Sequence, residues 1–173
     1  MRKVVLVLLL LSVFMTSCRF VNEFLAGEDG NVIDVPADDA EMNAAIQKAK
    51  ETLGIFVHAL RAPTPTQTHF SVKAVFPYED GQDGEHMWIG DLSFDGSHFH
   101  GILGNEPVYV KNLHYGDAVT VKVEDVTDWI IIDDGKLVGG FTISVLLNQM
   151  SERERKRYME ENGLFLGDEP LLP

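Results

Sequence analysis

Hydrophobic residues follow two different periods along this chain, and the change between them separates a helical part from a strand-rich part. From Asp38 to Leu60 apolar residues recur every three or four positions, which predicts one amphipathic helix. Asp38 and Glu41 have the spacing of a capping box at its start, and Pro63 prevents the helix from continuing. The first regular element is therefore expected to be a helix with one apolar face.

From Phe70 onward apolar and polar residues alternate, which is the period of half-buried β-strands. Asp95-Gly96 and Asp133-Asp134-Gly135 are hairpin signals, because these residues tolerate positive φ. Strands are predicted at residues 70–76, 85–94, 98–103, 119–123, 129–132 and 136–138, with a short extended segment at 108–110. Short turns join several of them, so we expect antiparallel pairing.

The C-terminal part returns to helical patterns. Residues 141–150 fit both periods, and of the two a helix is favoured. Residues 151–162 predict a highly charged surface helix, with Ser151 and Glu154 as a capping box and Gly163 at its end. The order of elements predicts an α+β fold in which the N-terminal amphipathic helix packs on a strongly bent antiparallel sheet, followed by C-terminal helices. An SH3-like or OB-like half-barrel would fit the short strands and tight turns.

The N-terminal segment has the pattern of a targeting signal. Arg2 and Lys3 precede an apolar run at residues 4–15, and Met15-Thr16-Ser17-Cys18 resembles the lipobox of bacterial lipoproteins, in which small residues precede the cysteine that takes the lipid. We expect a lipoprotein signal peptide that is cleaved before Cys18 and a lipid anchor on Cys18. The chain is then divided into the signal peptide (1–18), a tether (19–37), a single α+β domain (38–163) and a C-terminal tail (164–173).

The cysteine count and the net charge limit which compartment and which binding partners are expected. Cys18 is the only cysteine, so an exported chain has no internal disulfide and depends on its core alone. The formal net charge of −13 becomes −15 when Arg2 and Lys3 leave with the signal peptide. Such an acidic protein is not expected to bind nucleic acid, and anionic headgroups repel it, so membrane attachment rests on the lipid. Because Arg19 rather than Asp follows Cys18, we expect the bacterial cell envelope and, in a Gram-negative cell, the outer membrane facing the periplasm.

Glu85, His86 and Asp128 are the candidate catalytic residues. Both carboxylates adjoin a tryptophan-containing segment, which would desolvate them and raise their pKa, and a carboxylate pair facing across a groove suits glycoside hydrolysis. Against this, alternation places Glu85 and Trp88 on opposite faces of one strand, and Asp128 is equally well explained as a turn residue. The sequence has no phosphate loop, serine-hydrolase elbow or thiol nucleophile, so catalysis is not favoured and no cofactor is expected.

Two groups of side chains are candidates for binding. His98 and His100 lie on the same strand face, but zinc needs three or four converging ligands, so no metal site is predicted. Aromatic side chains most often fill a core, yet small barrels also bind through an aromatic face. The aromatic residues of this candidate binding face are Trp88, Tyr109, Tyr115 and Trp129.

Several different short motifs are spread widely through the strand region. They are Phe70-Ser71-Val72-Lys73, Glu85-His86-Met87-Trp88, Gly101, Asn105-Glu106-Pro107, Gly116-Asp117, Asp128-Trp129 and Gly139-Gly140-Phe141-Thr142. Together, from about residue 42 to about residue 150, they resemble the YegJ-like family of bacterial domains of unknown function. The resemblance implies no established activity and no catalytic residues.

The sequence therefore favours a lipid-anchored, noncatalytic binding or interaction module of the bacterial envelope, of which an immunity-type role is one form. Its expected partners are the membrane, through the lipid on Cys18, and an unidentified protein or small molecule. The alternative is an envelope hydrolase that uses Glu85, His86 and Asp128.

Overall fold

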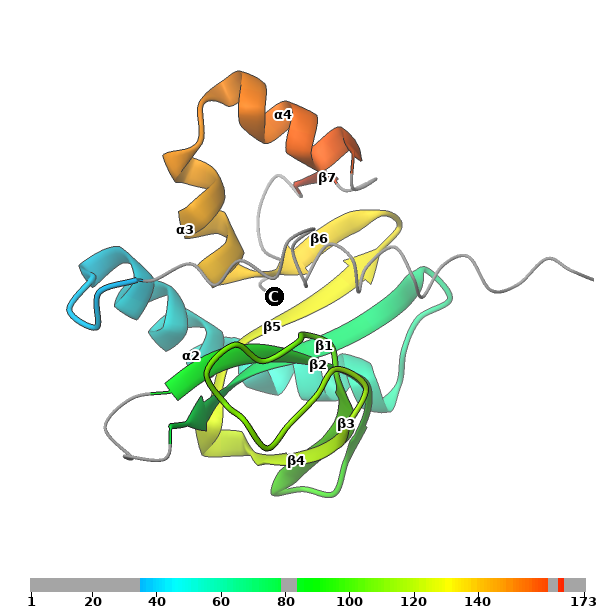
Figure 1. The fold of residues 1–173 in the computed structure, drawn as a ribbon. Helices are drawn as coiled ribbons and strands as arrows, with labels where there is room; N and C mark the ends of the chain where they lie inside the picture. The colour runs from blue at the N-terminus through cyan, green and yellow to red at the C-terminus, as the bar shows by residue number, and fades with distance from the viewer. Residues whose placement is uncertain (1–34, 79–83, 162–164, 167–173) are drawn as a thin grey trace, which may run out of the picture.

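The computed structural model of the protein describes residues 35–78, 84–161 and 165–166. The expected signal peptide, Cys18 and nearly all of the expected tether lie outside these described residues. The fold is α+β, as predicted, and within the described residues one helix precedes six antiparallel strands and two helices follow them (Figure 1). None of the helices within the described part of the chain is long and apolar enough to cross a membrane.

The first described helix, α2 (Ala40–Arg61), supplies the apolar face that the sequence predicted. Its N-cap is Asp39 rather than Asp38, because the Asp39 side chain accepts a hydrogen bond of 2.8 Å from the Met42 N–H. The predicted cap was therefore wrong by one residue. The helix buries Ala49 and Phe56 completely against the sheet.

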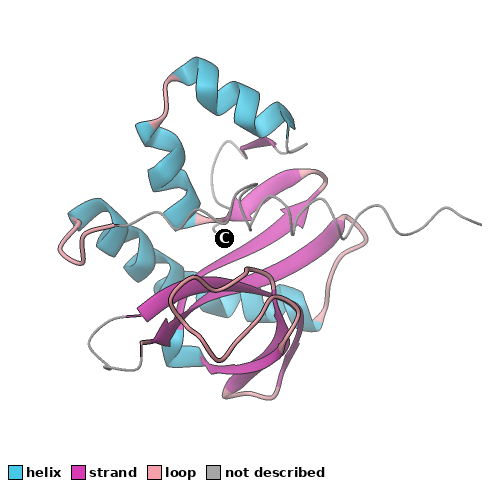
Figure 2. Cartoon of the chain, in the orientation of Figure 1, coloured by secondary structure: helices cyan, strands magenta, loops and turns pink. Residues whose placement is uncertain are grey.

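Six antiparallel strands form the sheet, in the order β4-β3-β2-β1-β5-β6, and a short β7 adds to it in parallel beside β6 (Figure 2). The strands are β1 (Gln67–Pro77), β2 (Gly84–Phe94), β3 (His98–Leu103), β4 (Ala118–Lys122), β5 (Val126–Asp133), β6 (Lys136–Gly139) and β7 (Phe165–Leu166), with a 3-10 turn η1 (Val123–Asp125) before β5. β4 and β7 are the two edges, so the sheet is not closed into a barrel. It is strongly bent, since β2, β3 and β4 curl away from β5 and β6 in Figure 1.

Two helices follow the sheet. The ambiguous stretch at 141–150 forms α3 (Phe141–Gln149), which confirms the favoured prediction. The next helix, α4 (Glu152–Glu161), begins with the predicted capping box, in which the Ser151 backbone N–H donates to the Glu154 carboxylate and the Glu154 N–H donates to the Ser151 hydroxyl.

The sheet separates two hydrophobic clusters. On one face α2 contributes Phe56 to a large core with Phe99 and Trp129, whose rings lie 6.0 Å and 5.7 Å from the Phe56 ring. On the other face α3 and α4 contribute Leu147 and Met159 to a smaller cluster that includes Trp88. We call these the α2 face and the α3 face of the sheet. β5 is buried on both, which makes it part of the centre of the fold.

Candidate functional site

The Glu85 side chain holds the long loop between β3 and β4 (residues 104–117). It lies on the α2 face, is 5% exposed, and its carboxylate accepts hydrogen bonds from the backbone N–H groups of Val108, Tyr109 and Val110 at 2.9, 3.0 and 3.2 Å. The segment 108–110, which was expected to be extended, is therefore part of a loop. Its N–H groups bond to a carboxylate instead of to a neighbouring strand.

A second set of contacts fixes the start of the same loop to β2. The Asn105 side-chain oxygen accepts a hydrogen bond of 2.6 Å from the Trp88 N–H, and the Gly104 N–H donates to the Trp88 carbonyl at 2.8 Å. Sequence reasoning did not identify Asn105 as a structural residue. Its position in the Asn-Glu-Pro motif was the one available signal.

The fixed loop presents apolar and aromatic groups outward. Val108, Tyr109 and Tyr115 are 37%, 48% and 52% exposed, and we call them the tyrosine surface. The Tyr78 ring, at the end of β1, packs edge-to-face on the Tyr109 ring with 5.7 Å between centroids. A contiguous exposed apolar patch rimmed by polar residues is a common feature of interaction sites.

The two tryptophans of the predicted binding face do not join this surface. Trp88 and Trp129 are only 4% and 1% exposed and belong to the clusters on opposite faces of the sheet. The Trp129 indole N–H donates to the Ala49 carbonyl at 3.1 Å, as a core tryptophan requires. Of the four predicted aromatic residues, Tyr109 and Tyr115 are thus the ones placed at the surface.

Asp128 caps the N-terminus of α3. Its carboxylate is fully buried and accepts hydrogen bonds from the Thr142 N–H at 2.8 Å, the Thr142 hydroxyl at 2.6 Å, the Trp129 N–H at 2.8 Å and the Phe141 N–H at 3.2 Å. Burial raises the pKa of Asp128, and the bonds from Thr142 and the nearby Lys73 ammonium oppose this shift.

The structure does not bring Glu85, His86 and Asp128 together. Glu85 lies on the α2 face. Asp128 lies beside Lys73 on the α3 face, and its carboxylate is turned toward α3. His86 is an exposed residue, and its Nδ1 lies 3.0 Å from the Thr127 hydroxyl. A glycosidase needs two carboxylates on either side of one bond of the substrate, and this arrangement does not supply them.

His98 and His100 both lie near the Asp95 carboxylate at the β2–β3 turn. The Asp95 carboxylate lies 3.0 Å from His100 Nε2 and 3.7 Å from His98 Nδ1. Backbone N–H groups of Ser97 and His98, and then the His100 ring, hold the pKa of Asp95 well below its usual value. No set of three side chains within the described ranges has the geometry of a metal site.

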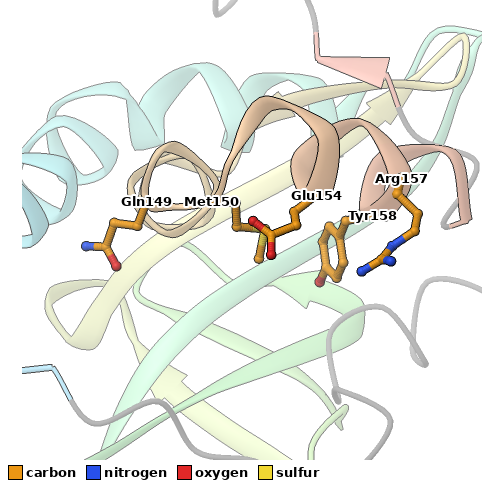
Figure 3. Close-up of a pocket in the computed structure, with 5 residues that line it drawn as sticks. All are labelled: Gln149, Met150, Glu154, Arg157 and Tyr158. Atoms are coloured by element: carbon orange, nitrogen blue, oxygen red, sulfur yellow. The ribbon is translucent and has the colours of Figure 1, made fainter.

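A shallow pocket of about 340 Å³ lies where α3 meets α4. Figure 3 shows the side chains that line it, which are Gln149, Met150, Glu154, Arg157 and Tyr158. None of the residues predicted from the sequence to act in catalysis or binding contributes to its lining. The Glu154 carboxylate there accepts hydrogen bonds from the Ser151 hydroxyl and N–H.

Comparison with known proteins gives a family and two relatives. Residues 39–165 match the family described as "Uncharacterized protein conserved in bacteria (DUF2314)". The chain is similar to "Putative ankyrin repeat protein NMB1133/NMB1171" of Neisseria meningitidis serogroup B (36% identity over 81% of this chain and 58% of that protein). It is also similar to "Uncharacterized protein YegJ" of Escherichia coli K12 (31% identity over 85% of this chain and 89% of that protein). The chain thus spans little more than half of the Neisseria relative, and no solved structure matches it.

Proposed function

We propose that this chain, which belongs to the DUF2314 family of uncharacterized proteins conserved in bacteria, is a noncatalytic binding module of the bacterial cell envelope, anchored by a lipid on Cys18. The observation that carries the binding role is the tyrosine surface. The anchor rests on the lipobox-like sequence that ends at Cys18, and on a net charge that does not favour adsorption to anionic lipids.

The tyrosine surface has the properties of a protein-binding site. Tyrosine adds large contact area at low conformational cost and is enriched at interaction hot spots. Here the loop is fixed beforehand, since the Glu85 carboxylate of β2 accepts hydrogen bonds from loop N–H groups and the Asn105 side chain of the loop accepts one from the Trp88 N–H of β2. Less entropy is therefore lost when a partner binds.

The partner we propose is a protein with basic residues around an apolar contact. The chain carries a formal net charge of −13, and Glu79, Asp80 and Asp83 follow Tyr78 in the sequence. On the loop itself the Glu106 side chain is 61% exposed. A negatively charged protein attracts a basic partner and speeds its association, and it repels an acidic one.

A photoreactive amino acid placed at Val108 in the full, membrane-attached protein tests this proposal in living cells. Irradiation should give one discrete protein adduct, identified by mass spectrometry, and the double substitution Tyr109→Ala and Tyr115→Ala should remove it. The same photoreactive group at Lys136 on β6, an exposed position at the other side of the sheet, serves as the control.

With the purified partner, each tyrosine substitution should raise the dissociation constant about tenfold or more. High salt should slow the association. An adduct that persists in the double variant, or the same adduct from Lys136, would exclude the tyrosine surface as the binding site.

A further inference from the structure

β4 is the longer of the two edge strands of the sheet. It is bonded to β3 on one side only, and the opposite edge of the sheet is the two-residue strand β7. The chain enters β4 directly from the loop that carries Tyr109 and Tyr115, so the edge is continuous with the tyrosine surface. An open edge is a template for the backbone of another chain.

The hydrogen bonds to β3 fix which backbone groups of β4 face outward. The Leu103 N–H donates to the Asp117 carbonyl at 2.9 Å, and the Val123 N–H donates to the Ser97 carbonyl at 3.1 Å. Both bonds join residues that are directly opposite in the antiparallel register, so every second residue between them bonds to β3 in the same way. The residues whose N–H and C=O groups point away from β3 are therefore Ala118, Thr120 and Lys122.

These outward groups are accessible to a partner. Ala118, Thr120 and Lys122 are all exposed, and within the described residues their N–H and C=O groups have no hydrogen-bond partner. Proline and bulges, which proteins use to block such an edge, do not occur in β4. The one charged side chain of the strand, Lys122, is paired with the Glu124 carboxylate at 3.6 Å.

Apolar groups gather at the end of β4 that adjoins the loop. Ile102 of β3 is 37% exposed and lies directly opposite Ala118. The Gly116 N–H donates to the Leu103 carbonyl at 3.0 Å, which places the neighbouring Tyr115 beside the end of β3. A chain bound along β4 therefore reaches the tyrosine surface without leaving the edge.

The charge around this edge favours a basic segment. From residue 104 to residue 125 the chain carries four carboxylates and two lysines. Glu106 and Glu124, near the two ends of this stretch, are 61% and 72% exposed. A second copy of this chain would instead bring the same negative charge to the edge, and two chains of formal net charge −13 repel each other.

We propose that β4 receives an extended, basic segment of the partner protein as an additional strand of the sheet. The backbone of this segment bonds to the outward N–H and C=O groups of β4, and its apolar side chains contact the tyrosine surface. The inference rests on the proposed function, because it assigns the tyrosine surface and β4 to one partner. Main-chain hydrogen bonds supply affinity in this mode of binding, and the side-chain contacts supply specificity.

Cross-links from two positions of β4 test for an extended segment. A photoreactive amino acid is placed at Ala118 or at Lys122 of the full chain in living cells, and mass spectrometry identifies the linked residue. Both positions should capture the protein that Val108 captures. Because paired strands advance equally per residue, the two linked residues should lie about four positions apart in one peptide of the partner.

Thr120→Pro removes the central outward N–H and keeps the bonds to β3. Proline is tolerated at an edge position whose N–H faces solvent, and here it should lower the yield of the Lys122 adduct about threefold or more, through the loss of one hydrogen bond. Thr120→Ala is the matched control. It removes the hydroxyl that lies 2.9 Å from His100 Nδ1 but keeps the N–H, so the yield should stay near that of the wild type. Urea denaturation establishes that both variants are folded.

The outcomes separate this inference from the proposed function. Absence of an adduct at Val108 overturns both. A Val108 adduct that needs the tyrosines, together with a Lys122 adduct that is indifferent to Thr120→Pro, overturns the added strand alone, as do linked residues scattered over separate segments of the partner. Linked peptides of this chain itself would place a second copy at the edge and overturn the basic partner. If Thr120→Pro does not fold, the spacing of the linked residues decides.

Discussion

Two buried carboxylates stabilise this protein by the same physical means. Glu85 accepts three backbone N–H groups of the β3–β4 loop, and Asp128 accepts the first N–H groups of α3. Burial of a carboxylate is costly unless hydrogen bonds replace the lost water, and both groups have such replacements. At the scale of single residues, the side chains that look most catalytic in the sequence act on the backbone.

Glu85→Gln tests the structural role of Glu85. The amide keeps one acceptor oxygen but adds a donor that faces other donors, so the free energy of unfolding should fall by about 1–3 kcal/mol. Hydrogen exchange should accelerate at the N–H groups of 108–110 more than in β1. The exposed Glu124, which pairs with Lys122 at 3.6 Å, offers the control Glu124→Gln, and its stability should stay near that of the wild type. Equal stability of Glu85→Gln and wild type would refute the structural role.

Acid should weaken the β2–β3 turn through Asp95. The N–H groups of Ser97 and His98 lower the folded-state pKa of this carboxyl below its ordinary value of 3.8, so the folded state binds fewer protons than the unfolded state. Its contribution is therefore present above about pH 3.8 and is lost as the pH falls through the folded pKa.

The urea midpoint of Asp95→Ala should consequently lie below that of the wild type at neutral pH. This gap between the two midpoints should be smaller at about pH 3. Thr68→Ala, an exposed change in β1 without a titratable group, should show the same gap at both pH values. A gap for Asp95→Ala that stays constant with pH would contradict the assignment.

At the scale of elements, the junction between β6 and α3 depends on two glycines. Gly139 and Gly140 have φ of +79° and +66°, which L-residues adopt at a cost. A Cβ on Gly139 would lie 2.6 Å from the Trp129 ring and still closer to the Trp129 carbonyl oxygen, both of them in the centre of the sheet. The chain can turn into α3 here because this position has no side chain.

Gly139→Ala should therefore lower the free energy of unfolding by about 2 kcal/mol or more, measured by urea denaturation. The matched control is Gly54→Ala in α2, where a Cβ would meet nothing within 4 Å. That change should stabilise the protein by about 0.5–1 kcal/mol, since alanine favours a helix interior. If both alanine variants shifted stability in the same direction, the steric explanation would fail.

The elements were predictable from the sequence where their signals are local. Periodicity and capping residues located α2 and α4, and the Asp133-Asp134-Gly135 turn has the positive φ values expected of a hairpin. The roles of Glu85 and Asp128 were not predictable, because their partners lie 23 and 14 residues further along the chain. The half-burial of Lys73 likewise depends on which strands flank β1, a property of the topology and not of the alternation.

At the scale of the whole molecule, the proposed binding site lies near one edge of the sheet. The tyrosine surface is on the loop before edge strand β4. An acidic domain does not stay at a membrane by charge alone, because its negative charge opposes adsorption to anionic lipids. The lipid proposed on Cys18 would hold the domain there, and would concentrate the tyrosine surface at the bilayer.

Cys18→Ser gives the test of this arrangement. Cells grown with radiolabelled palmitate should label the wild-type protein, and the variant should incorporate no label, because Cys18 is the only thiol in the chain. Ser12→Ala, inside the apolar run but outside the lipobox, should remain labelled. If the protein meets its partner only at the membrane, Cys18→Ser cells should not form the photo-adduct at Val108. The purified Cys18→Ser protein should still bind the partner. Labelled Cys18→Ser protein would refute the anchor, whereas loss of binding by the purified variant would show that the lipid itself contributes to the contact.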